Sequence, residues 1–412
     1  MGKDLVILAY SGGLDTSCIL KWLIQRKYDV VCYMADVGQK EDFDKAKQKA
    51  KAIGAKDVIV EDLRNDFVGN YMLPAIRMGL IYESRYYLGT SLARPCISVG
   101  IVKAAKKLGA KYISHGATGK GNDQVRFELS VYSLWPEGKV IAPWRIPEFF
   151  ERFQGRRDLI EFAKQENIPV SATPKEPWST DENIMHISYE SGVLEDPAAI
   201  PPKGIYKMTR DLGDSEDYVS VIDINFDKGT PISVRIPSGH EKALLVTDSL
   251  ALVETLNKLG GQHGVGRIDI VENRFLGLKS RGLYETPAGT ILHVAHVDLE
   301  AYALDKEVLR VKKYLQEKMA DFVYNGFWFS PEADFTRKCL DISQELVTGT
   351  VTVQIFKGNV SVLARKSANS LYNKDLVSMD VAGGFSPEDS TGFININALR
   401  LKEYARVSSQ TN

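Results

Sequence analysis

The chain has 412 residues, of which 44% are apolar and 25% charged, and its formal net charge is −1. This balance is typical of a globular protein, and the length predicts two domains or one domain with large elaborations. No dense block of Lys and Arg is present, so a nucleic acid or an anionic membrane is a poor partner and small-molecule substrates are expected.

The four cysteines, Cys18, Cys32, Cys96 and Cys339, lie far apart and form no CxxC pair. A disulfide framework or a zinc site is therefore not expected. No apolar run approaches the roughly 20 residues that span a bilayer, and no signal-like segment opens the chain. We expect a protein of a reducing, cytoplasmic compartment.

The chain up to about residue 170 alternates short apolar runs with amphipathic stretches. Strands are predicted at residues 5–10, 30–35, 58–63 and 112–114. Helices are predicted at residues 16–26, 43–53 and 99–108. This alternation predicts an α/β fold with a doubly wound, mostly parallel sheet and helices on both faces.

Prolines interrupt residues 169–177, and the pattern changes beyond them, which places a domain boundary between residues 165 and 180. Residues 221–236 and 351–363 each alternate apolar and polar residues around a turn, which predicts β-hairpins and an α+β second half. Residues 395–407 are a candidate amphipathic helix. It could dock on its own domain or pack on another subunit.

The first predicted strand runs into SGGLDTS, residues 11–17, at the start of a helix. Glycines permit close backbone approach, and a helix N-terminus offers unpaired N–H groups and the positive end of its dipole. Hydroxyls add donors at Ser11, Thr16 and Ser17. We therefore predict a phosphate site in preference to an ordinary strand-to-helix turn.

This loop is neither a Walker A loop nor a GxGxxG fingerprint. It resembles the pyrophosphate loop of the ATP pyrophosphatases, which implies transfer of AMP to an acceptor. The next strand ends beside it in a doubly wound sheet, where small Ala35 could leave room for an adenine ring.

The densest polar stretch is SHGATGKGNDQVRFE, residues 114–128, which follows the strand at 112–114. It should emerge at the same sheet edge as the first loop. Its glycines, hydroxyls and charges suit anionic and amide ligands, and Arg126 could bind a carboxylate through two parallel hydrogen bonds. His115 by itself is more typical of a structural histidine.

Two further segments are ambiguous by themselves. YYLGTSLARP, residues 86–95, places hydroxyls and Arg94 before a predicted helix, where a capped helix start is as good an interpretation as a substrate contact. Residues 264–287 mix charges and glycines, and structural ion pairs could account for part of that pattern.

Together with APWR at 142–145, PWSTDENIMHISYE at 177–190 and DSTGFININALRLKEY at 389–404, these segments resemble argininosuccinate synthase over essentially the whole chain. The resemblance implies a pyrophosphate-loop nucleotide-binding domain over residues 1–168. It also implies an α+β synthetase domain, for substrates and multimerisation, over residues 169–375. A C-terminal oligomerisation arm would cover residues 376–412.

The implied reaction has two steps. The ureido oxygen of citrulline attacks the α-phosphorus of ATP, so that pyrophosphate leaves and citrullyl-AMP forms; the amino group of aspartate then displaces AMP to give argininosuccinate. Positioning and charge stabilisation would carry much of this task. The resemblance further implies Mg²⁺ on the phosphates and a homotetramer, but the catalytic residue, the metal ligands and the group that deprotonates the amine stay unknown.

Binding residues follow from the resemblance position by position. ATP is assigned to Ala9, Tyr10, Ser11, Gly12, Gly13, Leu14, Asp15, Thr16, Ser17, Ala35, Ser114, His115, Gly116, Ala117, Thr118, Gly119, Lys120, Gly121 and Asn122. Citrulline is assigned to Tyr86, Ser91, Asn122, Arg126, Ser179, Ser188, Glu272 and Tyr284. Aspartate is assigned to Thr118, Asn122 and Asp123.

Two alternatives stay open on the residues alone. One is another adenylating enzyme, such as an amidotransferase-type synthetase or a tRNA thiolase, although no glutaminase nucleophile motif, paired-Cys site or basic face is visible. The other is an inactive nucleotide-binding sensor, which the intact phosphate loop disfavours.

Overall fold

The computed structural model describes residues 3–119, 121–169, 178–237, 243–380, 384 and 386–409. Contacts divide the chain into two compact units, Met1–Asn369 and Ser370–Asn412. The predicted domain boundary at residue 168 lies inside the first unit and stays a prediction.

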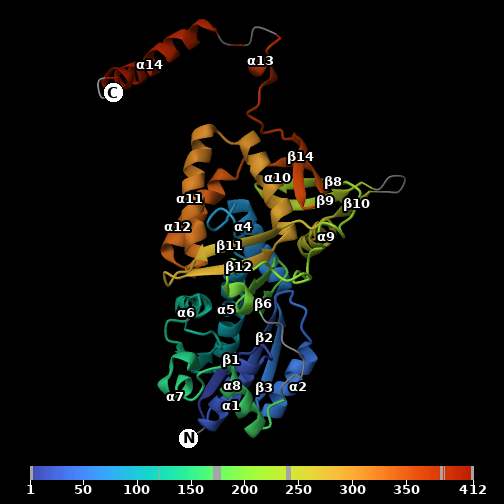
Figure 1. Ribbon diagram of the computed structural model, residues 1–412, viewed down its shortest axis with the longest axis vertical. Helices are drawn as coiled ribbons and strands as arrows, with labels where there is room; N and C mark the ends of the chain where they lie inside the picture. Colours follow the sequence, from blue (N-terminus) through green and yellow to red (C-terminus); the bar gives the residue numbers. More distant parts are fainter. Residues whose placement is uncertain are drawn as a thin grey trace. The chain divides into compact units, whose positions relative to one another are not determined.

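A parallel sheet of five strands begins the first unit (Figure 1). Its strands are β1 (Leu5–Ala9), β2 (Asp29–Asp36), β3 (Asp57–Asp62), β4 (Tyr112–Ser114) and β5 (Lys139–Ile141). Their order is β3-β2-β1-β4-β5, and each neighbouring pair is parallel. The chain moves outward from β1 in one direction and then continues on its other side, so the order reverses between β1 and β4. The predicted doubly wound sheet is confirmed.

Helices cover both faces of this sheet, because successive side chains of a strand point to opposite faces. On one face, Val6 and Leu8 pack against α1 (Leu14–Gln25), α2 (Phe43–Ile53) and α8 (Arg156–Gln165). On the other face, Ile7 packs against α5 (Gly89–Leu108) and α6 (Asp123–Leu134). Each fully buried aliphatic side chain contributes about 1.5–3 kcal/mol to this packing.

The helix predicted at residues 99–108 begins at Gly89, so the sequence prediction of its start was wrong. Glycine and proline lower helix propensity, and Pro95 lies inside the helix. Leu92 and Cys96 are fully buried on this part of the helix, so packing favours the helix despite its composition. Ser91 and Arg94 are consequently held on a long helix.

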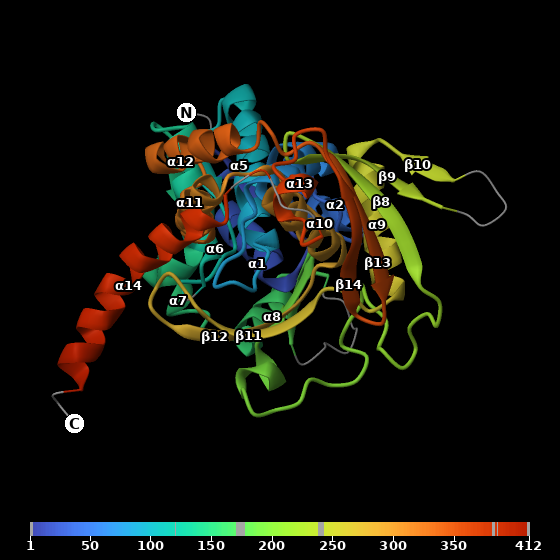
Figure 2. The same ribbon diagram turned by 90° about the horizontal axis from the view of Figure 1, so that it is seen from above.

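Two antiparallel sheets follow. The four-stranded sheet has the order β11-β12-β7-β6. The five-stranded sheet has the order β10-β9-β8-β13-β14, and Figure 2 labels all five of its strands. The strands are β6 (Ser179–Glu182), β7 (Ile187–Glu190), β8 (Ser220–Asp227), β9 (Thr230–Ile236), β10 (Leu244–Val246), β11 (Arg267–Asn273), β12 (Lys279–Glu285), β13 (Gly349–Phe356) and β14 (Asn359–Lys366). The predicted hairpins are confirmed as β8–β9 and β13–β14.

The remaining helices of the first unit pack mostly around these sheets. They are α3 (Arg64–Phe67), α4 (Leu73–Met78), α7 (Pro147–Phe150), α9 (Ser249–Gln262), α10 (Pro287–Ala303), α11 (Lys306–Tyr324) and α12 (Pro331–Ser343). The largest apolar core joins residues of α4, α9, α10 and α11 to β8 and β13. This core also reaches Ile270 of β11 and Tyr284 of β12, and a smaller cluster around Ile187, Tyr189 and Leu283 packs on the same four-stranded sheet.

The second unit contains α13 (Lys374–Val377) and α14 (Glu388–Ser408). The predicted amphipathic helix at 395–407 is the later part of α14, which has no buried residue. Phe393, Ile396 and Tyr404 are exposed. Within the described part of the chain, no helix is long and apolar enough to cross a membrane.

Candidate functional site

The loop after β1 is shaped to leave backbone donors available. Gly12 has φ 71°, in the left-handed region that favours glycine. Helix α1 begins at Leu14, and no side chain caps its N-terminus. Its first N–H groups and the positive end of its dipole are therefore available to an anion.

Hydroxyl contacts and one lysine hold this loop. Ser17 Oγ donates to the Gly13 carbonyl over 2.6 Å, and Ser11 Oγ lies 3.1 Å from Thr16 Oγ1. Lys49 Nζ, from α2, donates to the Gly12 carbonyl over 2.8 Å. This lysine brings a positive charge to the loop, although it belongs to none of the motifs that predicted the site.

The second glycine-rich stretch lies against the first, as expected. Leu8 of β1 pairs with Ser114 of β4. A Cβ atom at Gly116 would lie only 2.8 Å from Thr16 Cγ2, so the two loops touch at the point where the strand order reverses. Ligands bind at such switch points in doubly wound sheets. Lys120, predicted for ATP, lies outside the described residues.

His115 has a structural role in the second loop. Its Nδ1 accepts from the Ala117 N–H over 3.2 Å, and its Nε2 lies 3.1 Å from Glu128 Oε1. Arg145 pairs with the same Glu128 carboxylate over 2.5 Å. Burial raises the pKa of Glu128, but the hydrogen bonds from His115 and Arg145 outweigh it and lower that pKa. These contacts fix the turn that carries Gly116 and Ala117.

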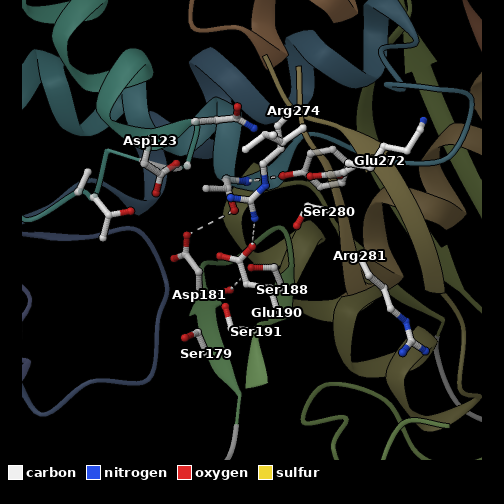
Figure 3. Close-up of a pocket in the computed structure, with 18 of the residues that line it drawn as sticks. Asp123, Ser179, Asp181, Ser188, Glu190, Ser191, Glu272, Arg274, Ser280 and Arg281 are labelled. Carbon is white, nitrogen blue, oxygen red and sulfur yellow. Dashed lines mark hydrogen bonds and ion pairs between the residues drawn. The ribbon is translucent and has the colours of Figure 1, made fainter. Parts of the chain in front are cut away.

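A pocket of about 770 Å³ opens beside this loop (Figure 3). It draws residues from α5, α6, the β6–β7 hairpin and the β11–β12 hairpin. Predicted site residues that line it are Tyr86, Gly116, Ala117, Thr118, Gly121, Asn122, Asp123, Arg126, Ser179, Ser188, Glu272 and Tyr284. Segments far apart in the sequence therefore meet in one cavity.

Other predicted residues do not line this pocket. They are residues 9–17 of the first loop, Ala35, Ser91, Ser114, His115 and Gly119. Ser91 lies in α5 with its Oγ buried and without a hydrogen-bond partner among the described residues, while its neighbour Thr90 faces the pocket.

Arg94 connects two carboxylates at the pocket wall. Its Nε and Nη2 donate to Asp123 Oδ2 over 3.1 and 2.8 Å, and it also pairs with Asp181 of β6. Burial raises the pKa of Asp181. Burial has the same effect on Asp123, but Arg94 and Arg126 outweigh it and hold the pKa of Asp123 at about 2. Asp123 is therefore a carboxylate at neutral pH.

Thr90 extends this network to a buried histidine. Its Oγ1 donates to Asp181 over 3.3 Å and lies 2.9 Å from His186 Nε2. Because the Thr90 hydroxyl donates its hydrogen to Asp181, its oxygen accepts a hydrogen bond from the His186 Nε2–H. Burial, with Arg94 and Arg126 nearby, lowers the pKa of His186 to about 3, so its ring is neutral.

Arg126 is fixed from two sides. Its Nε donates to the Tyr324 carbonyl over 2.9 Å, and its Nη1 pairs with Asp123 over 3.2 Å. The guanidinium also lies 4.9 Å from the centre of the Tyr324 ring, a cation–π distance. This side chain presents a fixed positive charge to the pocket.

Glu272, on β11, also lines the pocket. It accepts hydrogen bonds from the Tyr284 hydroxyl over 3.0 Å and from the Tyr324 hydroxyl over 2.8 Å. Burial raises the pKa of Glu272, and these two phenol donors counteract it. Burial also raises the pKa of Tyr86 to about 12, which keeps that phenol neutral. The pocket thus combines the fixed guanidinium of Arg126, which suits an anionic group of a ligand, with the Glu272 carboxylate, which suits a cationic group.

Several lining residues were not predicted. They are Thr90, Gln124, Asp181, Glu190, Ser191, Glu195, Pro197, Val271, Arg274, Leu278, Lys279, Ser280 and Arg281. Most of them belong to the motif segments quoted above, so those segments indicated the region of the pocket. The spacing of residues within a segment did not show which side chains face the pocket.

Two family models match this chain. The Arginosuccinate synthase N-terminal HUP domain matches residues 5–169, and the Arginosuccinate synthase C-terminal domain matches residues 178–404. The chain belongs to the argininosuccinate synthase family. Members of this family are ATP-dependent ligases that act on small molecules, and this protein is accordingly an ATP-dependent ligase.

Relatives match over nearly their full length. The argininosuccinate synthases of Aedes aegypti and Anopheles gambiae are 58% and 60% identical to this chain, covering 100% of it and 99% and 96% of their own lengths. The argininosuccinate synthase of Mus musculus is 57% identical, covering 99% of this chain and 98% of its own. The pocket residues between 86 and 126 and those between 179 and 284 therefore all lie within the matched region.

Proposed function

We propose that this protein makes argininosuccinate from citrulline, aspartate and ATP, with citrullyl-AMP as intermediate and AMP and pyrophosphate as products. One observation carries this proposal. The residues assigned to citrulline and aspartate come from distant segments, and nearly all of them line one pocket beside the two glycine-rich loops. A pocket that holds both amino acids beside the nucleotide suits a reaction that joins them through an adenylated intermediate.

In this proposal the loop at residues 11–17 binds the departing pyrophosphate. The uncapped N-terminus of α1 and the hydroxyls of Ser11 and Thr16 would supply the donors, while Ser17 donates to the Gly13 carbonyl and holds the loop. Gly116 and Ala117 border the pocket on the side of this loop, where the α-phosphate would lie. The negative charge that develops on the departing pyrophosphate would then be stabilised by donors that are already held in position.

Magnesium is proposed as the companion of ATP. Among the residues that the structure describes, no cluster of three or more His, Cys, Asp or Glu side chains could hold a metal ion. Mg²⁺ commonly uses substrate phosphates, water and one or two carboxylates, so a dedicated protein cage is not needed. Asp15, the acidic residue in the first turn of α1, is the carboxylate that we propose would hold it. The ion would neutralise charge on the phosphates.

The amino-acid substrates fit the charges of the pocket. The Arg126 guanidinium suits the citrulline carboxylate, and Glu272 suits its ammonium group. Ser179 and Ser188 would meet its polar oxygens, and both line the pocket. Aspartate would lie at Thr118, Asn122 and Asp123, between this site and the nucleotide loops.

We further propose a cytoplasmic homotetramer in which the arm from residue 376 binds a second subunit. Helix α14 has no buried residue, and its apolar side chains Phe393, Ile396 and Tyr404 are exposed. Analytical ultracentrifugation of the full chain should give four subunits, and removal of residues 376–412 should reduce that mass. An unchanged mass after truncation would argue against the role of the arm.

The function is tested with purified protein, ATP, Mg²⁺ and citrulline, with and without aspartate. Citrulline-dependent exchange of pyrophosphate into ATP is expected without aspartate, and argininosuccinate is expected with it. Pyrophosphate release that ignores citrulline would contradict the proposal and favour another adenylating enzyme. ATP binding without any turnover would favour a nucleotide sensor.

A further inference from the structure

Arg274 extends from the tip of the β11–β12 hairpin into the pocket (Figure 3). The backbone N–H of its neighbour Phe275 donates to Asn122 Oδ1 over 3.1 Å. A Cβ atom at Gly121 would lie 3.6 Å from Arg274 Nη1. The guanidinium is thus placed directly beside the stretch that carries Asn122 and Asp123.

The donors of Arg274 are only partly used. Its Nη2 pairs with Glu190 Oε2 of β7 over 2.5 Å. Its Nε is buried and has no hydrogen-bond partner among the described residues. A buried guanidinium N–H without a partner carries a desolvation penalty that an incoming acceptor removes.

Two of the other cations at the pocket wall, Arg281 and Arg126, are held by more partners than Arg274. Arg281 uses its donors on Asp269 and on the carbonyls of Asp196 and Ala199. Lys279 donates to Asn273 Oδ1 over 2.7 Å. Arg126 is held by Asp123 and Tyr324 and faces Glu272 at the proposed citrulline site. Arg274 therefore has one described ion-pair partner and keeps unused guanidinium donors beside the residues assigned to aspartate.

Aspartate differs from alanine by its side-chain carboxylate. The residues assigned to aspartate, namely Thr118, Asn122 and Asp123, offer a hydroxyl, an amide and an anion but no cation. A carboxylate that leaves water for a pocket needs a charge-assisted donor, which a guanidinium supplies well. The assigned residues alone do not explain a preference for a substrate with two carboxylates.

We propose that Arg274 binds the side-chain carboxylate of aspartate and thereby sets the choice of aspartate over amino acids with a neutral side chain. The assignment rests on the proposed function. Glu190 holds the guanidinium in place before aspartate arrives and competes with the substrate carboxylate for it. The two changes Arg274→Gln and Glu190→Gln should therefore act in opposite directions.

The test compares the full-length protein with Arg274→Gln, Arg274→Lys and Glu190→Gln, and Arg235→Gln serves as the matched control. Arg235 lies on β9, pairs with Asp223 over 3.5 Å and does not line the pocket. The KM values for aspartate and citrulline are measured separately, together with kcat/KM for aspartate, asparagine and alanine as amine donors.

Loss of one charge-assisted contact should lower the preference for aspartate over asparagine by about 10- to 100-fold in Arg274→Gln. The aspartate KM should rise with a much smaller change in the citrulline KM, and Arg274→Lys should recover part of the preference. In Glu190→Gln the aspartate KM should stay level or fall. A general loss of structure would raise both KM values together.

An active wild type whose Arg274→Gln variant keeps its preference for aspartate would overturn this assignment alone. An aspartate KM that rises equally in Glu190→Gln and Arg274→Gln would also overturn it. Both variants would then act by removing the structural ion pair between Arg274 and Glu190, without a contact from Arg274 to the substrate. A wild type that forms no argininosuccinate would overturn the proposed function and this assignment together.

Discussion

Arg126 reaches three groups from one side chain: the Asp123 carboxylate, the Tyr324 carbonyl and the Tyr324 ring. The sequence indicated Arg126 as a carboxylate ligand. The contacts add that its direction is fixed before any substrate arrives, because α6 carries it and the end of α11 accepts its Nε–H. A fixed guanidinium loses little freedom when it binds a carboxylate.

Replacement of Arg126 by Gln should therefore weaken citrulline binding. We expect the citrulline KM to rise about 10- to 100-fold, because one charge-assisted contact is lost. Steady-state kinetics with citrulline as the varied substrate measures this. Arg235→Gln, outside the pocket, is the control, and an unaltered citrulline KM would remove Arg126 from the site.

Tyr284 and Glu272 allow a prediction on pH. Burial raises the pKa of Glu272, and hydrogen bonds from Tyr324 and Tyr284 lower it. Tyr284→Phe removes one of these donors, so the pKa of Glu272 should rise further. On acidification, the Glu272 carboxylate that would bind the citrulline ammonium group is then protonated at a higher pH than in the wild type.

The expected result is a citrulline KM that increases on acidification at a higher pH in Tyr284→Phe than in the wild type. The pH dependence of that KM, measured with saturating ATP and aspartate, gives the shift. A parallel profile with a uniformly larger KM would mean that Tyr284 contributes packing and does not tune Glu272.

At the scale of elements, the site depends on close approach between loops and helix ends. The loop after β1 and the loop after β4 meet where Gly116 lies against Thr16 of α1. Parallel pairing of β1 with β4 brings their carboxyl ends to one edge and makes this contact possible. The sequence predicted both loops, and the strand order put them in contact.

Gly116→Ala should disturb this contact. The new Cβ would lie 2.8 Å from Thr16 Cγ2 and 3.6 Å from Ile19 Cδ1, so one loop must shift. We expect a stability loss of about 1–3 kcal/mol and a higher KM for ATP. Gly69→Ala is the control, because a Cβ there meets nothing within 4 Å. Equal ATP KM values in both variants would contradict this view of the loops.

At the scale of the whole molecule, buried histidines link stability to pH. Burial lowers the pKa of His186 to about 3 and of His293 to about 4, and it also lowers the pKa of His263 and His296. An unfolded histidine has a pKa near 6.5. Between that value and the lower folded value, the unfolded chain binds more protons, so stability falls as the pH decreases.

We therefore expect the free energy of unfolding to decline from about pH 6.5 downward, with His186 alone accounting for about 2 kcal/mol at about pH 5. Urea unfolding followed by circular dichroism at several pH values measures it. His186→Gln should show a smaller decline than the wild type. An identical pH dependence would mean that the pKa of His186 is the same in the folded and the unfolded chain.

The sequence by itself determined the fold class, the glycine-rich loop at the start of α1 and the membership of one family. Local features set these properties: apolar runs of strand length, glycines before a helix, and long motif runs. Nearly all residues assigned to citrulline and aspartate also proved to line one pocket, since the motifs carried them in groups.

Only the tertiary structure decided which side chains face each other. Packing extended α5 back to Gly89 through a proline, and so directed Thr90 to the pocket while Ser91 is buried away from it. Tertiary packing brought Asp181 of β6 to Arg94 of α5, and the hairpin contact at Asn122 brought Arg274 beside Gly121. These contacts join residues far apart in the chain, so no local pattern could specify them.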